Sequence, residues 1–359
     1  MIKSKKLLAI GVIAALGLAA CGSDDDSGSD TTDAPDSTEA APDGTDAMVD
    51  SDCSIGVVYD ITGRGDRSFN DAAGAGLDQA KADLGVAGSE STPTGDGDRA
   101  ERVQGLVDEG NGLVLGVGFL FGDSITAAAE GNPDTTFAIV DSVVDAPNVA
   151  SLVFAEEQGS FLVGAAAALK SQTGIVGFIG GVENDLIKKF EAGYAAGVAA
   201  VDPDIEVLTN YISQPPDFSG FNDPAKGKEL AAAQYEAGAD VIYSAAGGSG
   251  LGAFEAAAEA GEAGDVWAIG VDSDQYELVS AELQPYILTS MLKKVDVATF
   301  NTIEGFCAGD DVSGIQTFDL SVDGVGYSTS GGNVDDIADQ LDAFKEQIVS
   351  GEIEVPTAP

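Results

Sequence analysis

The segment from Ile55 to Leu77 constrains the fold more strongly than any other part of the sequence. Its apolar run Ile55–Val58 predicts a buried strand, the glycine-rich stretch Tyr59–Asp71 predicts a turn, and the run from Ala72 predicts the start of a helix. Similar patterns follow along the chain, and strands that alternate with helices indicate parallel βαβ units. Ligands of such proteins bind where the strands end in turns. We therefore predict an α/β fold with a binding site at this first turn.

The turn Tyr59–Asp71 combines carboxylates, an asparagine amide and the ring of Phe69. Such groups hydrogen-bond hydroxyls and stack on flat ring systems. A helix cap would explain Asp66 or Ser68 alone, but not the whole set. We predict that four neighbouring residues of the turn belong to a ligand site: Asp66, Ser68, Phe69 and Asn70.

A second series of strands and helices begins near Gly174, and the chain from about Cys53 is long enough for two lobes. We predict a first lobe of residues 53–155 and about 296–359, and a second lobe of residues 156–295. A hinge would join them, and a ligand cleft would lie between them at the strand ends. We also expect residues 88–98 to form a loop and a helix to begin at Met291.

Residues 1–20 are predicted to form a signal peptide. Three lysines precede an apolar run that ends at Ala20, and this run is shorter than the ~20 residues that a membrane-spanning helix needs. The residues Leu-Ala-Ala-Cys that end at Cys21 resemble the bacterial lipoprotein box, so we expect Cys21 to carry a lipid. The alternative is an ordinary exported protein with an unrelated cysteine at its cleavage site.

Residues 21–52 are acidic, contain neither lysine nor arginine, and offer few large apolar side chains. Burial within such a segment does not offset the entropy lost on ordering, which predicts a disordered tether. We therefore expect an exported protein that a lipid anchors to the outer face of the cell membrane.

The acidic excess excludes several classes of function. The chain has 16 Lys and Arg residues against 61 Asp and Glu residues, a net charge of −45, and no histidine. A nucleic-acid-binding surface needs basic residues, so we expect no nucleic-acid partner. The lack of histidine excludes Ser-His-Asp and Cys-His catalysis and removes the usual transition-metal ligand. We expect neither an enzyme nor a bound metal or cofactor.

Two cysteines follow Cys21 in the sequence. Cys53 precedes the first predicted strand, and Cys307 ends a late predicted helix. In an exported protein such a pair forms a disulfide or remains as two buried thiols. A disulfide would tie the returning chain to its start.

The turn matches Asp-x-x-Gly-x-x-Asp-x-Ser-Phe-Asn, which resembles the signature of the basic membrane protein family of substrate-binding lipoproteins. Further matches are Phe-Ala-Ile-Val-Asp at 137–141, Phe-Glu-Ala-Gly-Tyr at 190–194, Asp-Pro-Ala-Lys-Gly at 223–227, Ala-Ala-Gly-Gly-Ser-Gly-Leu-Gly at 245–252, Ile-Gly-Val-Asp-Ser-Asp-Gln at 269–275 and Ser-Met-Leu-Lys at 290–293. The resemblance covers about Ser54 to Gly309. It implies a type I periplasmic-binding-protein-like fold and a receptor that delivers a nucleoside, with purine expected, to an ABC permease.

The resemblance also implies roles for single residues. Phe69 and Phe221 would stack on the two faces of the base, and Asp141 would bond the edge of the base. Asp272 and Lys293 would bind the ribose hydroxyls. The remaining groups of the cleft would be Asp60, Asn70, Phe119, Gly247 and Gly248.

Several alternatives stay open at this point. Phe218 competes with Phe221 for the second ring, Lys294 competes with Lys293, and a helix cap would also explain Asp141. A sugar or another small polar metabolite would also suit rings and carboxylates, either for transport or for sensing.

Two further patterns are weaker. Gly248–Ala253 satisfies Gly-x-Gly-x-x-Ala with Asp272 about 20 residues on, as in dinucleotide-dependent oxidoreductases, but no histidine is present to act as a base. Arg64-Gly65-Asp66 is a tripeptide that some adhesion receptors recognise. Three residues recur by chance, however, and Asp66 belongs to the predicted binding turn.

Overall fold

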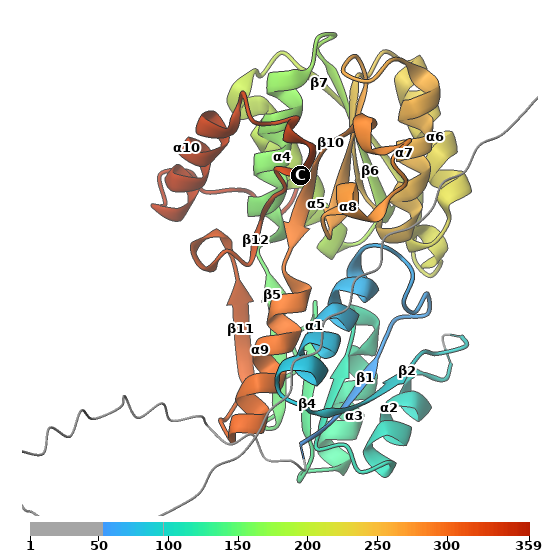
Figure 1. The fold of residues 1–359 in the computed structure, drawn as a ribbon, viewed down its shortest axis with the longest axis vertical. Coiled ribbons are helices and arrows are strands. Elements are labelled where there is room, and N and C mark those ends of the chain that lie inside the picture. Colours follow the sequence, from blue (N-terminus) through green and yellow to red (C-terminus); the bar gives the residue numbers. More distant parts are fainter. Residues whose placement is uncertain (1–52, 96) are drawn as a thin grey trace, which may run out of the picture. The chain divides into compact units, whose positions relative to one another are not determined.

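The structure of the protein is a computed structural model that describes residues 53–95 and 97–359 (Figure 1). The predicted signal peptide, the lipidation site Cys21 and the predicted tether of residues 21–52 lie outside these residues. In the described part of the chain, no helix combines the length and the apolar character that crossing a membrane requires.

Among the described residues, six parallel strands form the sheet of the first lobe, in the order β11-β5-β4-β3-β1-β2. The strands are β1 (Ser54–Val58), β2 (Ala87–Ser91), β3 (Leu113–Gly116), β4 (Thr136–Val140), β5 (Val149–Phe154) and β11 (Gly314–Phe318). Helices α2 (Arg99–Asp108) and α3 (Gly122–Gly131) pack on one face, and α1 (Phe69–Asp83) and α9 (Val295–Ala308) pack on the other. Because both faces are covered, the central strands are nearly continuous apolar runs.

The second lobe repeats this arrangement. In the same described part, its six strands follow the order β12-β10-β9-β8-β6-β7. They are β6 (Ile175–Val182), β7 (Glu206–Ser213), β8 (Val241–Ala245), β9 (Trp267–Asp272), β10 (Ile287–Lys293) and β12 (Val325–Tyr327). Helices α4 (Glu156–Lys170) and α5 (Asp185–Val201) cover one face, and α6 (Pro224–Glu236) and α7 (Gly250–Ala260) cover the other. By position in the sheets, β4 of the first lobe corresponds to β9 of the second.

The end of the chain divides between the lobes. The sequence assigned residues 296–359 to the first lobe, and α9 and β11 do lie there. β12, however, pairs antiparallel with β10 in the second sheet. A turn closed by the Gly324 N–H and the Asp319 carbonyl, 2.8 Å apart, directs the chain from one sheet to the other. Helix α10 (Ala338–Val349) then packs on α4, with the ring centroids of Phe344 and Phe161 5.5 Å apart.

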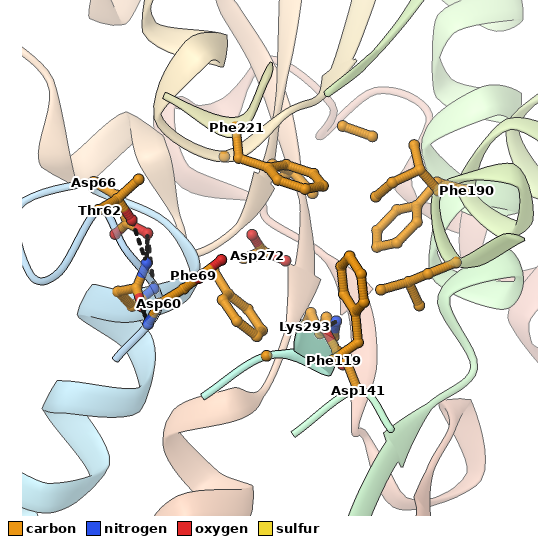
Figure 2. A pocket seen from close by; sticks show the side chains of 17 residues that line it. Asp60, Thr62, Asp66, Phe69, Phe119, Asp141, Phe190, Phe221, Asp272 and Lys293 are labelled. Carbon is orange, nitrogen blue, oxygen red and sulfur yellow. Dashed lines mark hydrogen bonds and ion pairs between the residues drawn. The ribbon is translucent and has the colours of Figure 1, made fainter. Parts of the chain in front are cut away.

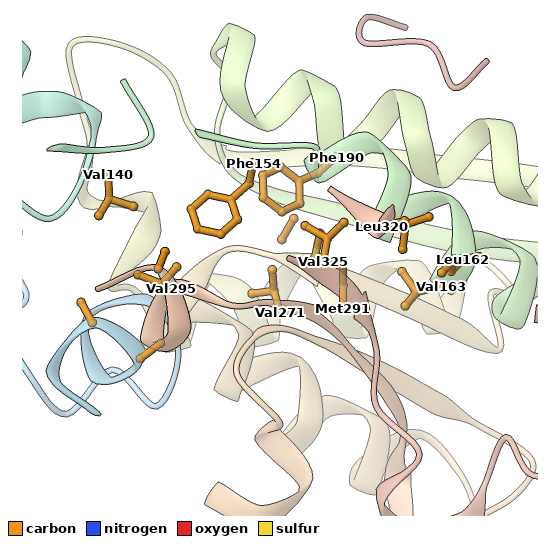
Figure 3. Packing of buried hydrophobic residues seen from close by; sticks show 14 of the residues in the cluster. Val140, Phe154, Leu162, Val163, Phe190, Val271, Met291, Val295, Leu320 and Val325 are labelled. Carbon is orange, nitrogen blue, oxygen red and sulfur yellow. The ribbon is translucent and has the colours of Figure 1, made fainter. Parts of the chain in front are cut away.

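One buried hydrophobic cluster extends from the first lobe into the second (Figure 3). It passes through the segments in which the chain runs from one lobe to the other. Val140 and Phe154 enter it from the first sheet, Val271 and Met291 from the second, and Val295 from the start of α9. The strand ends that bear the predicted site are therefore supported by packed side chains that both lobes share.

Two local predictions are wrong. Residues 88–91, predicted as loop, belong to β2, which pairs with β1 at the sheet edge. An edge strand buries its side chains only in part, so its small polar residues give no strand pattern. Residues 291–293, predicted as helix, continue β10, because a short apolar run does not distinguish a buried strand from a helix.

Helices α4 and α5 approach each other closely at glycine residues. A Cβ atom on Gly197 would overlap the carbonyl oxygen of Phe161, and one on Gly164 would overlap the carbonyl oxygen of Tyr194. This backbone-to-backbone packing fixes the position of α5, whose first turns reach the predicted site.

Cys53 and Cys307 are joined by a disulfide, with their Cα atoms 5.6 Å apart. Of the two alternatives for this pair, the structure therefore contains the bonded one. The bond ties the residue before β1 to the end of α9, across a sequence separation of 254 residues. Because β1 begins there, the disulfide lies beside the amino-terminal ends of the strands. The predicted site lies at the opposite, carboxyl ends.

Candidate functional site

Most of the predicted site residues meet in one cleft between the lobes (Figure 2). They belong to the segments that follow or end β1, β3 and β4 in the first lobe and β7, β8, β9 and β10 in the second. Parallel strands of one sheet end at the same edge, which is why distant segments of the sequence converge here. The predicted residues that line the cleft are Asp60, Asp66, Phe69, Asn70, Phe119, Asp141, Phe221, Gly247, Asp272 and Lys293.

Two predicted residues do not line the cleft. The Ser68 side chain is fully buried, and its Oγ lies 2.7 Å from Asp272 Oδ2 and 3.1 Å from the carbonyl oxygen of Val271. Ser68 therefore orients a residue of the lining. Gly248 does not belong to the lining, and a Cβ atom on it would come within 3.4 Å of Asn222 Oδ1.

Other lining residues were not predicted from the sequence: Thr62, Gly118, Leu186, Ile187, Phe190, Ala245 and Val271. Leu186, Ile187 and Phe190 lie in the first turns of α5. Because α5 follows β6, whose carboxyl end points toward the cleft, the rule that ligands bind where strands end also applies to this helix. Phe190 in addition begins one of the sequence motifs.

Among the described residues, four phenylalanine rings surround the cleft, those of Phe69, Phe119, Phe190 and Phe221 (Figure 2). Phe218 lies outside the lining and packs against Phe119, with the ring centroids 6.0 Å apart and the ring planes at 65°. The structure thus brings Phe221 to the cleft. Of the two neighbouring lysines, Lys293 lines the cleft, whereas Lys294 occupies the residue before α9.

The first turn is held in place by Asp66. Its carboxylate accepts hydrogen bonds from the backbone N–H groups of Ser68, Asn70 and Asp71, at 3.0, 2.8 and 3.1 Å, and from Asn70 Nδ2 at 2.9 Å. The helix-cap explanation therefore applies to Asp66, which also lines the cleft. Burial raises the pKa of Asp66, and these hydrogen bonds offset the increase in part.

Asp141 and Asp272 occupy corresponding positions in the two lobes, after β4 and at the end of β9. Both have a left-handed backbone, with φ of 64° and 65°. An L-residue with a side chain rarely adopts this conformation, although aspartate tolerates it better than most. Paired strained residues at a cleft are typical of a binding site. Burial raises the pKa of Asp272.

Lys293 is the centre of a buried ionic cluster. Its side chain is 2% exposed, and its Nζ lies 2.6 Å from Asp141 Oδ2 and 3.4 Å from Glu156 Oε1. Glu156 is also 3.3 Å from Lys189 Nζ. The Lys293 ammonium lies 5.1 Å from the ring centroid of Phe69 and 5.7 Å from that of Phe190, within the range of cation–π attraction.

Burial alone would lower the pKa of Lys293, but the neighbouring charges of Asp141, Glu156 and Asp272 outweigh it and raise this pKa above its ordinary value. Lys293 is thus a permanent cation. Burial raises the pKa of Asp141 to about 6, although the charge of Lys293 acts in the opposite direction. Asp141 Oδ1 is buried and has no hydrogen-bond partner among the described residues. This oxygen is therefore available to accept a hydrogen bond.

The charges of the cleft disfavour an anionic ligand. Its lining among residues 53–95 and 97–359 contains four carboxylates and one ammonium group, those of Asp60, Asp66, Asp141, Asp272 and Lys293. Arg99 pairs with Asp60 at 3.3 Å from outside this lining. The described residues contain no group of three His, Cys, Asp or Glu side chains placed to hold a metal ion.

Comparison with known proteins gives consistent results. Residues 54–358 match the family described as "ABC transporter substrate-binding protein PnrA-like". The "ABC transporter nucleoside-binding protein BmpA" of Lactococcus lactis is 35% identical over 331 residues, which cover 88% of this chain and 92% of that protein. "Basic membrane protein D" of Borreliella burgdorferi is 30% identical over 300 residues, which cover 81% of this chain and 84% of that protein.

Solved structures share the fold. A solute-binding protein of an ABC transporter system from Aeropyrum pernix superposes with a TM-score of 0.74 at 28% identity, covering 85% of this chain and 93% of that one. The arabinose-binding protein AraP of Geobacillus stearothermophilus gives a TM-score of 0.58 at 15% identity, covering 82% and 99%, and shows the fold alone. The predicted type I periplasmic-binding-protein-like fold with two βαβ lobes is confirmed.

Proposed function

The chain belongs to the family of PnrA-like ABC transporter substrate-binding proteins, as its motifs predict, and we propose that its ligand is a nucleoside, with purine nucleosides preferred. The family consists of substrate-binding proteins and not of enzymes, in agreement with the sequence. One observation carries the proposal: the cleft presents aromatic rings beside carboxylates that accept hydrogen bonds. A nucleoside combines a flat base with a ribose that donates such bonds. The name of the relative from Lactococcus lactis supports the same ligand class.

In the proposed complex, Phe69 and Phe221 stack on the base, and Asp141 Oδ1 accepts a hydrogen bond from an N–H of its edge. Asp272 accepts hydrogen bonds from the ribose hydroxyls, and the Lys293 ammonium donates to a ribose oxygen. The cleft location of these five side chains supports the assignment, and the unpartnered Asp141 Oδ1 supports it most directly. Figure 2 shows these side chains around one common space.

The proposed setting is an ABC importer at the outer face of the cell membrane. The family description names an ABC transporter, and the N-terminal sequence predicts export and a lipid on Cys21. The two lobes would close over the nucleoside and present it to the permease, as hinged binding proteins do. The excess of carboxylates over lysine in the cleft would exclude phosphorylated nucleotides, because their charge would meet like charges at short range.

Thermal unfolding of the purified protein with candidate ligands tests the proposal. A nucleoside at 100 times its dissociation constant should stabilise the fold by about 2.7 kcal/mol and raise Tm by several degrees. We expect inosine, guanosine or adenosine to do so, and AMP, ribose and arabinose not to. A shift with ribose or arabinose alone would disprove the nucleoside assignment. It would leave unchanged the conclusion that the two lobes bind a small ligand between them.

Substitution of the stacking ring locates the ligand. Phe221→Ala should cost about 1–3 kcal/mol of binding free energy, the usual contribution of one base–aromatic stack. Phe218→Ala is the matched control, because Phe218 lies in the same loop but outside the cleft lining. Titration calorimetry should show a much larger loss for Phe221→Ala. Equal losses would remove Phe221 from the site.

Nucleoside affinity should depend on pH through Asp141. With a pKa of about 6, its carboxylate is ionised at pH 7 and mostly protonated at pH 5. The charges of Lys293, Glu156 and Asp272 act on Asp141 but do not reverse the increase in its pKa. Protonation places a hydrogen on the acceptor, so inosine affinity should fall about tenfold from pH 7 to pH 5. In Asp141→Asn the affinity should be lower and nearly constant over this range. Constant affinity in the wild-type protein would contradict the role of Asp141.

A further inference from the structure

We propose that Gln275 and Ser273 are positioning residues that hold the Phe69-bearing turn of the first lobe against the second lobe. They would thereby shift the equilibrium between the open and closed states of the cleft toward the closed state. Neither side chain lines the cleft. The proposal rests on the proposed function only for its ligand-binding readout, since closure of the lobes is measurable without ligand.

Besides the bonds from Ser68 Oγ to the Val271 carbonyl and to Asp272, two hydrogen bonds from residues that follow β9 connect the lobes at this point. Gln275 Nε2 donates to the carbonyl oxygen of Arg67 at 2.9 Å, and Ser273 Oγ donates to the carbonyl oxygen of Ser68 at 2.9 Å. Both donors follow β9 in the second lobe, and both acceptors directly precede Phe69 at the start of α1 in the first lobe. The second lobe therefore binds the backbone that carries one of the proposed stacking rings.

The Gln275 carboxamide is held in a fixed orientation. The residue has no exposed surface, and its Oε1 accepts a hydrogen bond from the Val271 N–H at 2.9 Å. Its backbone N–H donates to Ser290 Oγ at 3.1 Å. Gly270 leaves room for the carboxamide, because a Cβ atom there would come within 2.7 Å of Gln275 Oε1. With Oε1 fixed within its own lobe, the NH₂ group faces the other lobe.

Arg67, whose carbonyl oxygen accepts this hydrogen bond, has an unusual backbone conformation. Arg67 has a left-handed backbone with φ of 53°, while its side chain is exposed. An arginine rarely adopts this conformation without a compensating contact. The hydrogen bond from Gln275 is such a contact, and it forms only when the two lobes are together.

These contacts predict a specific kinetic effect. A group that favours the closed state without touching the ligand changes the open-to-closed equilibrium equally for every ligand. Loss of the Gln275 or Ser273 donor should therefore accelerate dissociation of all nucleosides by the same factor. The ratio of the affinities for two nucleosides should remain unchanged.

Gln275→Glu is the test variant, because it keeps the shape and the oxygen that accepts from Val271 but replaces the donor to Arg67 by an acceptor. Ser273→Ala removes the second donor, and Ser273→Thr restores a hydroxyl. Gln284→Glu is the matched control, since Gln284 Nε2 donates at 3.0 Å to the Tyr276 carbonyl within the second lobe. Small-angle X-ray scattering of each ligand-free protein measures the proportion of open molecules.

We expect Ser273→Ala to lower the closed-to-open ratio by roughly fivefold, as for loss of one net hydrogen bond. Gln275→Glu should lower it further, because it also turns a buried carboxylate toward the Arg67 carbonyl oxygen. Ser273→Thr and Gln284→Glu should scatter like the wild-type protein. Scattering of both test variants identical to the wild type, or equal opening in Gln284→Glu, would overturn the proposal.

Stopped-flow dissociation of inosine and adenosine provides the second readout. Both off-rates should rise by the same factor in Gln275→Glu, whereas a changed affinity ratio would show that Gln275 acts on the ligand and would overturn the positioning role. If neither nucleoside binds the wild-type protein, the proposed function fails, and the scattering result still decides the positioning role.

Discussion

Lys293→Met is expected to lower the free energy of unfolding at pH 7 by about 3–5 kcal/mol, the usual cost of removing one partner from a buried ion pair. The Lys293 ammonium lies 2.6 Å from Asp141 and 3.4 Å from Glu156, and all three side chains are buried. Without the cation, Asp141 must remain buried as an unpaired carboxylate or take up a proton. Nucleoside binding should also be lost, because the ribose loses a donor and the cleft becomes more acidic. Urea unfolding and calorimetry measure the two effects.

The loss of stability in Lys293→Met should be smaller at pH 5 than at pH 7. The pKa of Asp141, about 6, is above its ordinary value, so ionisation of this group opposes folding as the pH rises through 6. Removing Lys293 strengthens that opposition only where Asp141 is ionised. Asp141→Asn in the same chain should restore part of the stability, and Lys294→Met is the adjacent control, with an expected change of about 0.5 kcal/mol or less. Equal losses in the two lysine variants would contradict this account.

Loss of the disulfide is expected to have an effect of similar size. Replacement of Cys53 and Cys307 by serine should lower the free energy of unfolding by about 3–5 kcal/mol, because a bond that closes so long a loop strongly restricts the unfolded chain. The separation of 254 residues places this protein at the upper end of that range. Thermal unfolding with and without reductant provides an independent comparison in the wild-type protein.

Ligand binding is the control for the disulfide. The bond lies at the start of β1, beside the amino-terminal ends of the strands, whereas the cleft lies at their carboxyl ends. The double serine variant should therefore bind nucleosides with nearly wild-type affinity at temperatures where it is folded. A large loss of affinity in the folded variant would indicate that the bond also positions the cleft, which its location does not predict.

The sequence predicts the elements that are buried and strongly patterned. The apolar strand β1 is found where it was expected, and Asp60, Asp141 and Asp272 line the cleft because strand ends determine where polar residues gather. The edge strand β2 was missed because partly buried small residues carry little strand signal. The helix expected at Met291 was wrong because local pattern does not reveal that β10 continues between two neighbours.

Contacts between distant segments were outside the reach of sequence patterns. Nothing in the sequence near Glu156, at the start of α4, indicates that it would pair with Lys293, which lies far along the chain at the end of β10. The hydrogen bonds from Gln275 and Ser273 to the first turn depend in the same way on the approach of the lobes. Phe190 was accessible in principle, because it begins a motif and follows a strand end.

Strands β11 and β12 come near the end of the chain, yet each forms an edge of a different sheet. During synthesis, neither sheet is complete until residues 314–327 have emerged, so neither lobe is an independent folding unit made from one continuous stretch. Until then β5 and β10 present unpaired backbone edges, which favour pairing with other chains. A chain that stops before Gly314 would therefore yield two unfinished sheets and aggregation, and not one intact lobe beside a damaged one.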